Sequence, residues 1–308
     1  MGLPVTVYRH TDVGAPIVRP TRPSDWLAVL KACLVTGYGT KQPLGWTLEF
    51  EGTYKAAFKN KVSDGGSGCM LRFSDVTGSN PSGGDFDMAM SRNMSDVDTY
   101  IDKLQSRRFR TYNNAAGVKG WTIIGTSRGF WMISVNSTTG SLDTLQTYFL
   151  HNAFFGDVES FIPNDISSFG MLTGVSTTGD STNISSSYMI GTSDGMYITH
   201  LAADGSSGKV EYSYLYNNKL TTVDGGDIGT TNVPAVLNTP LLVGIAGNGN
   251  PAFNLCRGKI PGLHELQHAG CKYVNYPILR TFDGIEYEAI VGAKVPIFWI
   301  QVSGNWYE

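Results

Sequence analysis

Charged residues are scarce in this sequence. Lys, Arg, Asp and Glu together make up 16% of the 308 residues, against about 25% in typical globular proteins. The 23 basic and 26 acidic side chains give a formal net charge of -3, which excludes a globally basic nucleic-acid-binding protein. Only the run Arg107-Arg108-Phe109-Arg110 comes close to a basic patch. We therefore expect no nucleic-acid partner.

Long apolar runs and paired cysteines are also lacking. No stretch reaches the roughly 18 apolar residues of a membrane-spanning helix, so we expect no membrane association. Cys33, Cys69, Cys256 and Cys271 lie far apart, and none has the C-x-x-C spacing of a zinc or redox site. This cysteine usage is ordinary for a protein that folds in a reducing cytoplasm, and it predicts buried thiols.

Glycine and aromatic residues, by contrast, are abundant. The chain has 37 Gly, 14 Phe, 15 Tyr and 6 Trp, which is enough apolar surface for a core and excludes disorder as the main state. Short runs in which apolar residues alternate with other residues, separated by Gly or Asn-Gly, are typical of β-strands joined by turns. We predict a mainly β fold of the α+β type, with antiparallel sandwich-like or barrel-like sheets, one N-terminal helix and few short helices.

The periodicity of apolar residues predicts the individual elements. Residues 20–36 should form a helix that Ser24 caps and Gly37 ends, with Trp26 and Leu30 packed on a strand at 46–58. Two strands within 120–135 should form a hairpin around 125–129. Gly156-Asp157 should end a strand at 147–155. Further strands are predicted at 3–8, 69–73, 188–190, 196–201, 212–216, 241–245, 254–257, 272–279, 286–290 and 297–302.

Two stretches rich in Gly, Ser, Thr, Asn and Asp, at 74–87 and 173–187, are predicted to be loops. The second one marks the expected boundary between an N-terminal α+β domain, 1–172, and a C-terminal β-rich domain, 173–308. Residues 95–104 fit either a short helix or a loop.

One segment has a catalytic spacing: His264-Glu265-Leu266-Gln267-His268 matches H-E-x-x-H. On a helix the two histidines lie one turn apart and reach one zinc ion, and the glutamate serves as general base. Pro261-Gly262 and Gly270 leave at most about eight residues for such a helix. We therefore expect a short helical turn over the end of a sheet, with no catalytic residue, metal or cofactor. The candidates for a third zinc ligand are Cys271, Glu286 and Glu288.

Two other kinds of cluster are weaker. The glycines of Gly37-x-Gly39 and Gly244-x-x-Gly247-x-Gly249 lack the strand–glycine–helix order of a dinucleotide site and predict turns. Four acidic residues lack the Gly and the terminal Glu of an EF-hand loop, and we expect them to be solvated loop carboxylates. They are Asp85, Asp87, Asp96 and Asp98.

Several segments carry a resemblance that covers nearly the whole chain. The most specific ones are Leu34-Val35-Thr36-Gly37-Tyr38-Gly39, then Gly45-Trp46-Thr47, then Phe50-Glu51-Gly52-Thr53-Tyr54-Lys55. Together they resemble a family of tailed-bacteriophage virion structural proteins associated with the tail or baseplate. Further matching segments are Val7-Tyr8-Arg9 with Asp12-Val13-Gly14-Ala15-Pro16, Met94-Ser95-Asp96-Val97-Asp98, Phe154-Phe155-Gly156-Asp157-Val158-Glu159-Ser160-Phe161 and Arg257-Gly258-Lys259-Ile260-Pro261-Gly262-Leu263.

The resemblance implies a structural protein of the virion tail that is made in the host cytoplasm and is not an enzyme. Its expected partners are other tail or baseplate proteins and copies of itself in a symmetric ring or collar. The family brings no catalytic residue and has no H-E-x-x-H segment after its proline-glycine-leucine. A surface with few charges is easily desolvated when it meets another protein. We expect the loops at 74–87 and 173–187 to lie at contacts between subunits. A carbohydrate-binding or receptor-binding β module and a zinc hydrolase using His264, Glu265 and His268 remain the alternatives.

Overall fold

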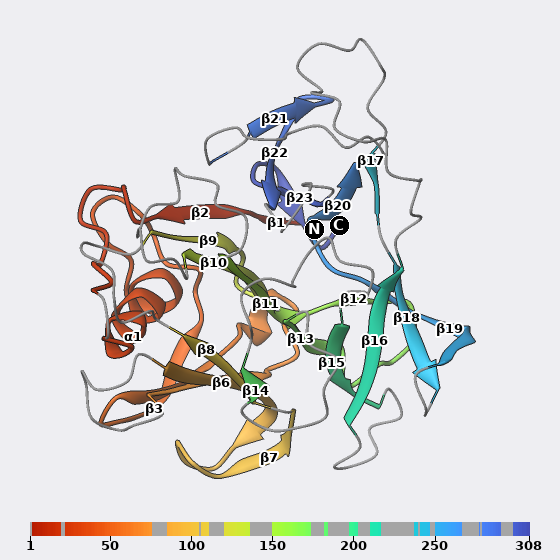
Figure 1. The fold of residues 1–308 in the computed structure, drawn as a ribbon, viewed down its shortest axis with the longest axis horizontal. Helices are drawn as coiled ribbons and strands as arrows, with labels where there is room; N and C mark the ends of the chain where they lie inside the picture. The colour runs from red at the N-terminus through yellow and green to blue at the C-terminus, as the bar shows by residue number, and fades with distance from the viewer. Residues whose placement is uncertain are drawn as a thin grey trace.

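Strands form along most of the chain, and the protein is mainly β, as predicted (Figure 1). The computed structural model describes residues 2–19, 22–75, 85–104, 106–110, 120–135, 150–173, 182–183, 197–202, 210–216, 237–239, 241–246, 250–266, 277, 279–290 and 298–308. Within these ranges the sheets are open rather than closed into a barrel, and no helix is both long and apolar enough to cross a membrane.

The largest sheet contains ten described strands, all antiparallel to their neighbours. Strands from both sides of the predicted domain boundary pair within it, and the boundary itself stays a prediction. In spatial order the strands are β12 (Glu159–Ser160), β19 (Asn250–Lys259), β18 (Leu241–Ala246), β16 (Val210–Tyr216), β15 (Tyr197–Leu201), β13 (Phe169–Leu172), β11 (Leu150–Asp157), β10 (Gly129–Val135), β9 (Trp121–Gly125) and β2 (Thr6–Arg9).

A seven-stranded sheet, formed mostly by the first half of the chain, lies beside the helix (Figure 1). Its strands are antiparallel except for the pair β14–β8. They are β14 (Thr182–Asn183), β8 (Arg107–Arg110), β6 (Asp85–Met94), β5 (Met70–Asp75), β4 (Lys55–Lys59) and β3 (Thr47–Gly52), with β7 (Tyr100–Lys103) paired to β6.

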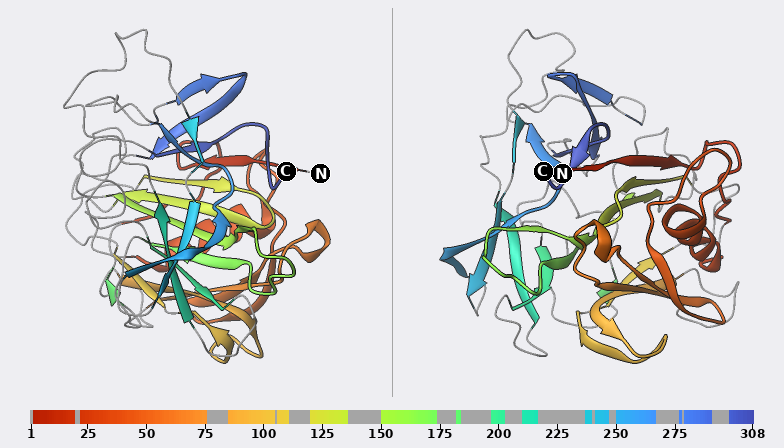
Figure 2. Two further views of the ribbon diagram at one scale, coloured as in Figure 1. Left: turned by 90° about the vertical axis from the view of Figure 1, so that its right-hand side faces the viewer. Right: turned by 180° about the vertical axis from the view of Figure 1, so that it is seen from behind.

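Two smaller sheets complete the described fold. One has five strands: β17 (Leu237–Asn238), β20 (Leu263–Leu266), β23 (Phe298–Gln301), β22 (Ile285–Ile290) and β21 (Leu279–Phe282). The other pairs β1 (Leu3–Pro4) with β24 (Asn305–Trp306) and places Leu3 opposite Trp306. The two marked ends of the chain therefore lie side by side in both views of Figure 2.

One hydrophobic core connects the helix and the three larger sheets. A row of aromatic rings crosses from the seven-stranded to the ten-stranded sheet, with Phe86 stacked 5.2 Å from Phe109 and Phe109 lying 6.0 Å from Phe155. Phe130 lies 5.6 Å from Phe155 and 5.5 Å from Trp46. The two sheets thus pack face to face, as the sandwich-like prediction implied.

The N-terminal helix covers the seven-stranded sheet. Helix α1 (Ser24–Lys31) continues into the π-helical turn η1 (Ala32–Thr36), and Gly37 ends it at φ 76°, as predicted. The predicted Ser24 cap is wrong, because Pro23 already has a helical backbone and occupies the N-cap, so Ser24 is the first helical residue. Buried Trp26 lies 5.9 Å from Phe86, and α1 contacts β4, which confirms the predicted packing.

Several predicted boundaries differ from the structure. The segment at 46–58 is a hairpin, because the chain turns at Thr53-Tyr54 between β3 and β4. The predicted loop at 74–87 begins and ends in strands β5 and β6, and residues 76–84 between them lie outside the described ranges. Residues 100–103 form β7, because they pair with β6. The strands predicted at 188–190 and over most of 272–279 also lie outside the described ranges, as does most of the 173–187 loop.

The predicted hairpin of β9 and β10 is confirmed. The 3-10 turn η2 (Val62–Asp64) lies in the connection between β4 and β5. This connection reaches the β9–β10 turn, where Lys61 N donates to Ser127 O at 3.0 Å. The two turns thereby bring polar side chains from the seven-stranded and ten-stranded sheets together.

Candidate functional site

The H-E-x-x-H segment begins in a strand. His264 and Glu265 lie on β20, which pairs with β23 and places His264 opposite Trp299. Successive strand residues point to opposite faces, so the helical geometry that a zinc site needs is absent from the described half of the motif. The helical turn predicted here is wrong, because residues 263–266 continue a sheet. His268 lies outside the described residues.

The structure does not gather the candidate third ligands around His264. Glu288 is fully buried and forms an ion pair with Arg9 of β2. The strand register puts His264 and Ala289 on one face of the five-stranded sheet, which leaves Glu288 on the other. Glu286 is exposed on that other face, and Cys271 lies outside the described residues. Across the described ranges, no three His, Cys, Asp or Glu side chains are grouped as metal ligands.

His264 packs as a neutral ring. It lies edge-on to Tyr287, with 5.1 Å between the ring centroids. Burial, reinforced by the positive charge of Lys259, lowers the pKa of His264 to about 4. The side chain is therefore uncharged at neutral pH, and it is half-buried on a strand that pairs on both sides.

The prediction of solvated loop carboxylates is confirmed for Asp96 and Asp98, which are exposed between β6 and β7, and is wrong for Asp85 and Asp87. Asp85 and Asp87 lie in β6 rather than in a loop, because this stretch pairs with β5 and β8. Asp96 closes a turn by accepting hydrogen bonds from the backbone of Asp98 and Thr99, at 2.7 and 2.9 Å. The ion-pair partners are Arg108 for Asp87, and Lys55 and Arg72 for Asp98.

The glycines at 37 and 39 shape a turn, as predicted. Gly39 has φ 54° and lies so close to the N-terminal loop that an added Cβ would be 2.4 Å from Val13 O. Between the glycines, Tyr38 donates its hydroxyl to Asp12 at 2.9 Å. Gly244 lies within strand β18 rather than in a turn, because β18 pairs on both sides. Gly247 and Gly249 lie outside the described residues.

Arg107 and Arg108, the two arginines of the 107–110 run whose side chains the structure describes, do not make an exposed basic patch. The run forms β8, in which Arg107 is completely buried. Arg108 is neutralised by Asp87, with 2.9 Å between Nε and Oδ1.

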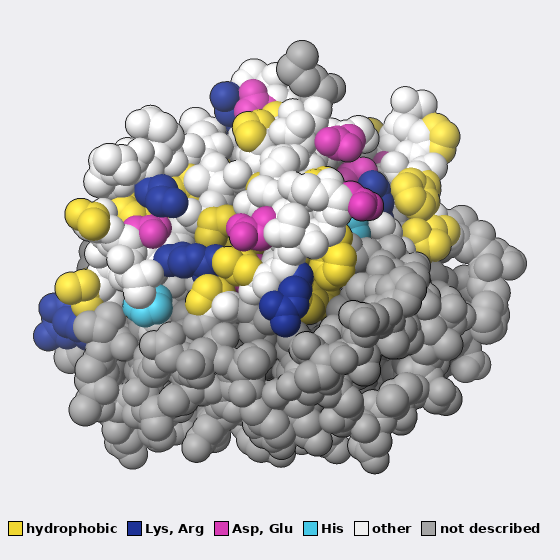
Figure 3. All heavy atoms as spheres, turned by 90° about the horizontal axis from the view of Figure 1, so that it is seen from above, with side chains coloured by type: hydrophobic (Ala, Val, Ile, Leu, Met, Phe, Trp, Pro, Cys, Tyr) yellow, Lys and Arg dark blue, Asp and Glu magenta, His cyan; other side chains and the backbone are white. Residues whose placement is uncertain are grey.

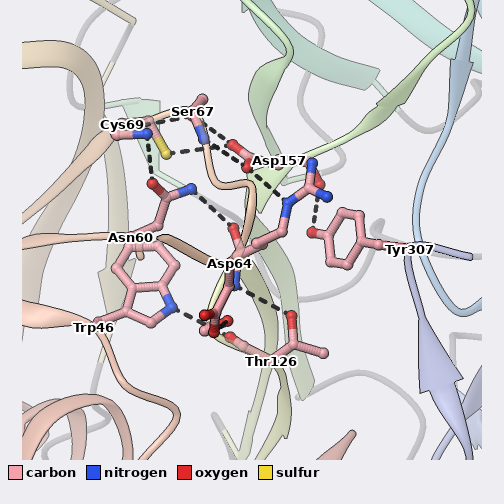
Figure 4. A network of polar contacts seen from close by, with 11 residues as sticks. Trp46, Asn60, Asp64, Ser67, Cys69, Thr126, Asp157 and Tyr307 are labelled. Carbon is pink, nitrogen blue, oxygen red and sulfur yellow. Dashed lines mark hydrogen bonds and ion pairs between the residues drawn. The ribbon is translucent and has the colours of Figure 1, made fainter. Parts of the chain in front are cut away.

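An extended cluster of polar contacts surrounds Asp157 (Figure 4). This residue is the last of β11, and its side chain is fully buried. Its carboxylate contacts two other segments, the β4–β5 connection and the β9–β10 turn. Oδ2 accepts a hydrogen bond from Ser67 N at 2.9 Å and lies 3.2 Å from Arg128 Nε. Oδ1 accepts one from Ser67 Oγ and lies 3.8 Å from Cys69 Sγ. The backbone oxygen of Asp157 accepts a hydrogen bond from the hydroxyl of Tyr307 at 2.7 Å.

Neighbouring contacts extend this cluster. Asn60 accepts from Gly68 N at 2.7 Å and donates to Arg128 O at 3.2 Å. Ser127 donates to Asp64 at 2.6 Å, and Trp46 Nε1 donates to Thr126 O at 3.2 Å. The cluster thereby joins the β4–β5 connection, the β9–β10 turn, β11 and the segment after β23.

The electrostatics of the cluster favour a structural role. Burial raises the pKa of Asp157 despite its bonds to Ser67 and Arg128, and it raises the pKa of the Cys69 thiol well above its usual range. A thiol with a raised pKa is a poor nucleophile. Both oxygens of the carboxylate already have partners inside the protein. The Asp157 cluster therefore joins segments of the chain and does not expose a reactive side chain.

Another buried ion pair links β19 to the connection after β12. Arg257 of β19 and Asp165 are both almost fully buried, with 2.9 Å between Nε and Oδ2. Arg257 also donates to Leu201 O at 3.2 Å, at the end of β15. Ser160 and the backbone of Ser167 donate to Asp165 at 2.6 and 2.9 Å.

Sequence reasoning missed both clusters. Asp157 was expected only to end a strand, and Arg257 and Asp165 lie about 90 residues apart. Neither cluster has a local signal in the sequence, because the partners lie far apart along the chain. No protein-family model matches the chain, and no curated protein is significantly similar to it.

Proposed function

We propose that the chain is a structural protein of a bacteriophage virion that belongs to the tail or baseplate and assembles through protein–protein contacts. The proposal is supported mainly by the structural role of residues in the segments that resemble the phage family. Tyr38, Trp46, Asp157 and Arg257 each stand in one of them and each bonds a separate part of the chain. Such residues build a rigid body, which a repeated structural subunit requires.

The surface is consistent with this role. On the described part of the face seen from above Figure 1, basic, acidic and apolar side chains are interspersed (Figure 3). Seven large apolar side chains are exposed among the described residues and are available for protein contacts, although single exposed apolar residues are also normal on monomeric proteins. They are Val13, Ile17, Val62, Ile101, Phe161, Ile166 and Leu241.

The two alternative functions receive less support. All six tryptophans are buried, so a sugar-binding platform would lack the side chain that stacks best on a sugar ring. A zinc hydrolase would need His264 and Glu265 on a helix, and they lie on β20. We therefore propose a structural protein without catalytic activity.

Quantitative mass spectrometry of purified phage particles tests the proposal. The chain should be present in a fixed number of copies that matches a ring or collar, together with other tail proteins. Its absence from mature particles would overturn the proposal. Chelator-sensitive peptidase activity of the purified protein, lost in Glu265→Ala but retained in the control Glu49→Ala at an exposed position outside the proposed zinc site, would favour the zinc alternative instead.

A further inference from the structure

The hairpin between β21 and β22 carries an Asp-Gly pair at its tip (Figure 1). Phe282 pairs with Ile285, so Asp283 and Gly284 alone form the turn. Both residues are exposed, and both have positive φ, 48° and 78°. Asp-Gly is a preferred sequence for a two-residue turn of this kind, because glycine tolerates a left-handed backbone. The same pair is chemically labile, because an aspartyl carboxyl can react with the amide nitrogen of the next residue.

Three features of this turn leave the two reacting groups accessible. Among the described residues, no hydrogen bond or ion pair engages the carboxylate of Asp283 or the backbone N–H of Gly284. An added Cβ at Gly284 would meet nothing within 4 Å, so the space beside its nitrogen is open. The tip is held only through its flanking strands, and exposed loop tips open most readily.

A second Asp-Gly pair in the same chain provides an internal comparison. Asp64 accepts a hydrogen bond from Ser127 Oγ at 2.6 Å. Gly65 N donates to Val62 O at 2.9 Å. Both reacting groups are therefore engaged at Asp64-Gly65, whereas both are accessible at Asp283-Gly284. The Asp-Gly pairs outside the described residues are 194–195, 204–205 and 224–225.

We propose that Asp283-Gly284 is a site of spontaneous isoaspartyl modification in the folded protein. The amide nitrogen of Gly284 attacks Cγ of Asp283 and forms a C–N bond. The amide proton and the carboxyl hydroxyl leave together as water, which closes a succinimide ring. Water then opens the ring. Its attack at Cγ restores aspartate, and its attack at the main-chain carbonyl carbon of Asp283 gives isoaspartate. The reaction needs no oxidant, metal or enzyme.

The modification changes the backbone of the turn. In isoaspartate the main chain runs through Cβ and Cγ of residue 283, which adds a methylene group to the turn. A two-residue hairpin turn depends on a defined backbone conformation, so the longer turn fits the pairing of β21 with β22 poorly. β21 is an edge strand, and β22 is its partner among the described strands. β22 is also paired with β23, so β21 should loosen first.

Ageing of the full-length protein at neutral pH tests the site. Peptide mapping with electron-transfer fragmentation locates isoaspartate, and circular dichroism of the same samples confirms that the protein stays folded. Isoaspartate should accumulate at residue 283 to a level several-fold above that at residue 64. Equal amounts at the two positions would overturn the proposal. So would its absence at residue 283 under conditions in which a synthetic peptide of residues 279–287 forms it.

Two variants test the mechanism. Gly284→Ala places a methyl group beside the attacking nitrogen, at a position where nothing lies within 4 Å of the added Cβ. Asp283→Glu keeps the charge but lengthens the side chain, which disfavours ring closure. Both variants should lower the isopeptide linkage at residue 283 several-fold. The modified wild type should lose amide-exchange protection in β21 and keep it in β23. A wild-type rate in Gly284→Ala would refute the mechanism, and full protection of β21 in the modified protein would refute the effect on the hairpin.

Discussion

Asp157 shows how one side chain can connect a β fold that has few charges. Its carboxylate is inaccessible to solvent and accepts bonds from the β4–β5 connection and the β9–β10 turn. A buried carboxylate is costly unless it is paired and hydrogen-bonded. Here the partners reduce that cost without removing it, because burial still raises the pKa of Asp157.

The raised pKa of Asp157 predicts an unusual direction of pH dependence. The folded protein holds this proton more tightly than the unfolded chain does. Its stabilising contribution is therefore complete below the unfolded pKa of about 3.9 and is lost as pH rises through the folded pKa. Denaturant unfolding of wild type and Asp157→Asn as a function of pH checks this.

The wild-type protein should lose stability relative to Asp157→Asn as pH rises from about 3.9. Asp157→Ala, which leaves Ser67 and Arg128 without their acceptor, should cost about 3 kcal/mol at neutral pH. A pH-independent difference between wild type and Asp157→Asn would show that the carboxyl is not desolvated.

His264 predicts the opposite pH dependence. Its folded pKa of about 4 lies below its ordinary value of 6.5, so its neutral form stabilises the fold. That stabilisation is complete above pH 6.5 and is lost as pH falls from 6.5 toward 4. The loss should be on the order of 2 kcal/mol. His264→Phe keeps an aromatic ring against Tyr287 and should abolish this part of the acid sensitivity. Equal acid sensitivity of the two proteins would contradict the buried, neutral histidine.

At the scale of elements, close backbone approach at glycine fixes where strands meet. Gly156 of β11 pairs with Gly129 of β10, and an added Cβ at Gly156 would lie 2.3 Å from Gly129 Cα. Gly156-Asp157 was predicted to end a strand, because glycine usually interrupts one. β11 does end at Asp157, and glycine at position 156 allows the last part of the strand to pair across this tight contact.

Gly156→Ala should destabilise the protein by about 3 kcal/mol or more, since the backbone of β10 cannot move aside. Gly284→Ala is the matched control, because Gly284 also has a positive φ, 78°, but has nothing within 4 Å of an added Cβ. That change should cost about 1 kcal/mol through backbone strain alone. Chemical denaturation measures both. Similar costs for the two variants would show that the contact between β10 and β11 is not tight.

The helix offers a separate test of packing. Leu30 is fully buried on the face of α1 that packs on the sheet. Leu30→Ala should cost about 2–5 kcal/mol through lost burial and a residual cavity. Lys31→Ala, which removes only the surface ion pair with Glu51, should cost less than about 1 kcal/mol. A change in Tm of less than about a degree for Leu30→Ala would refute the packing.

Local signals predicted more of the elements than of their connections. The 3.6-residue stripe of Trp26 and Leu30, the ending at Gly37 and the β9–β10 turn depend on neighbouring residues and were read correctly. β7 and the strand at Leu263–Leu266 were missed, because their conformation depends on pairing with β6 and β23. Long-range partners of that kind leave no mark in a local pattern.

At the scale of the whole molecule, one core and a few buried ion pairs unite sheets from distant parts of the chain. Arg9 and Glu288 join β2 to β22, and Arg257 and Asp165 join β19 to the connection after β12. The sequence shows each charge but not its partner, because the partners are separated by about 90 to 280 residues. The H-E-x-x-H spacing can be recognised in the sequence because it is a local pattern. Strand pairing at His264 and Glu265 prevents the helix that the spacing implies.

The central claim is that this rigid β body is a repeated subunit of a phage tail or baseplate. A cryo-electron microscopy reconstruction of the intact particle tests it most directly. We predict that the fold described here fits density at the tail in several symmetry-related copies that contact one another and neighbouring tail proteins. A tail and baseplate whose density is fully explained by other chains would contradict the claim.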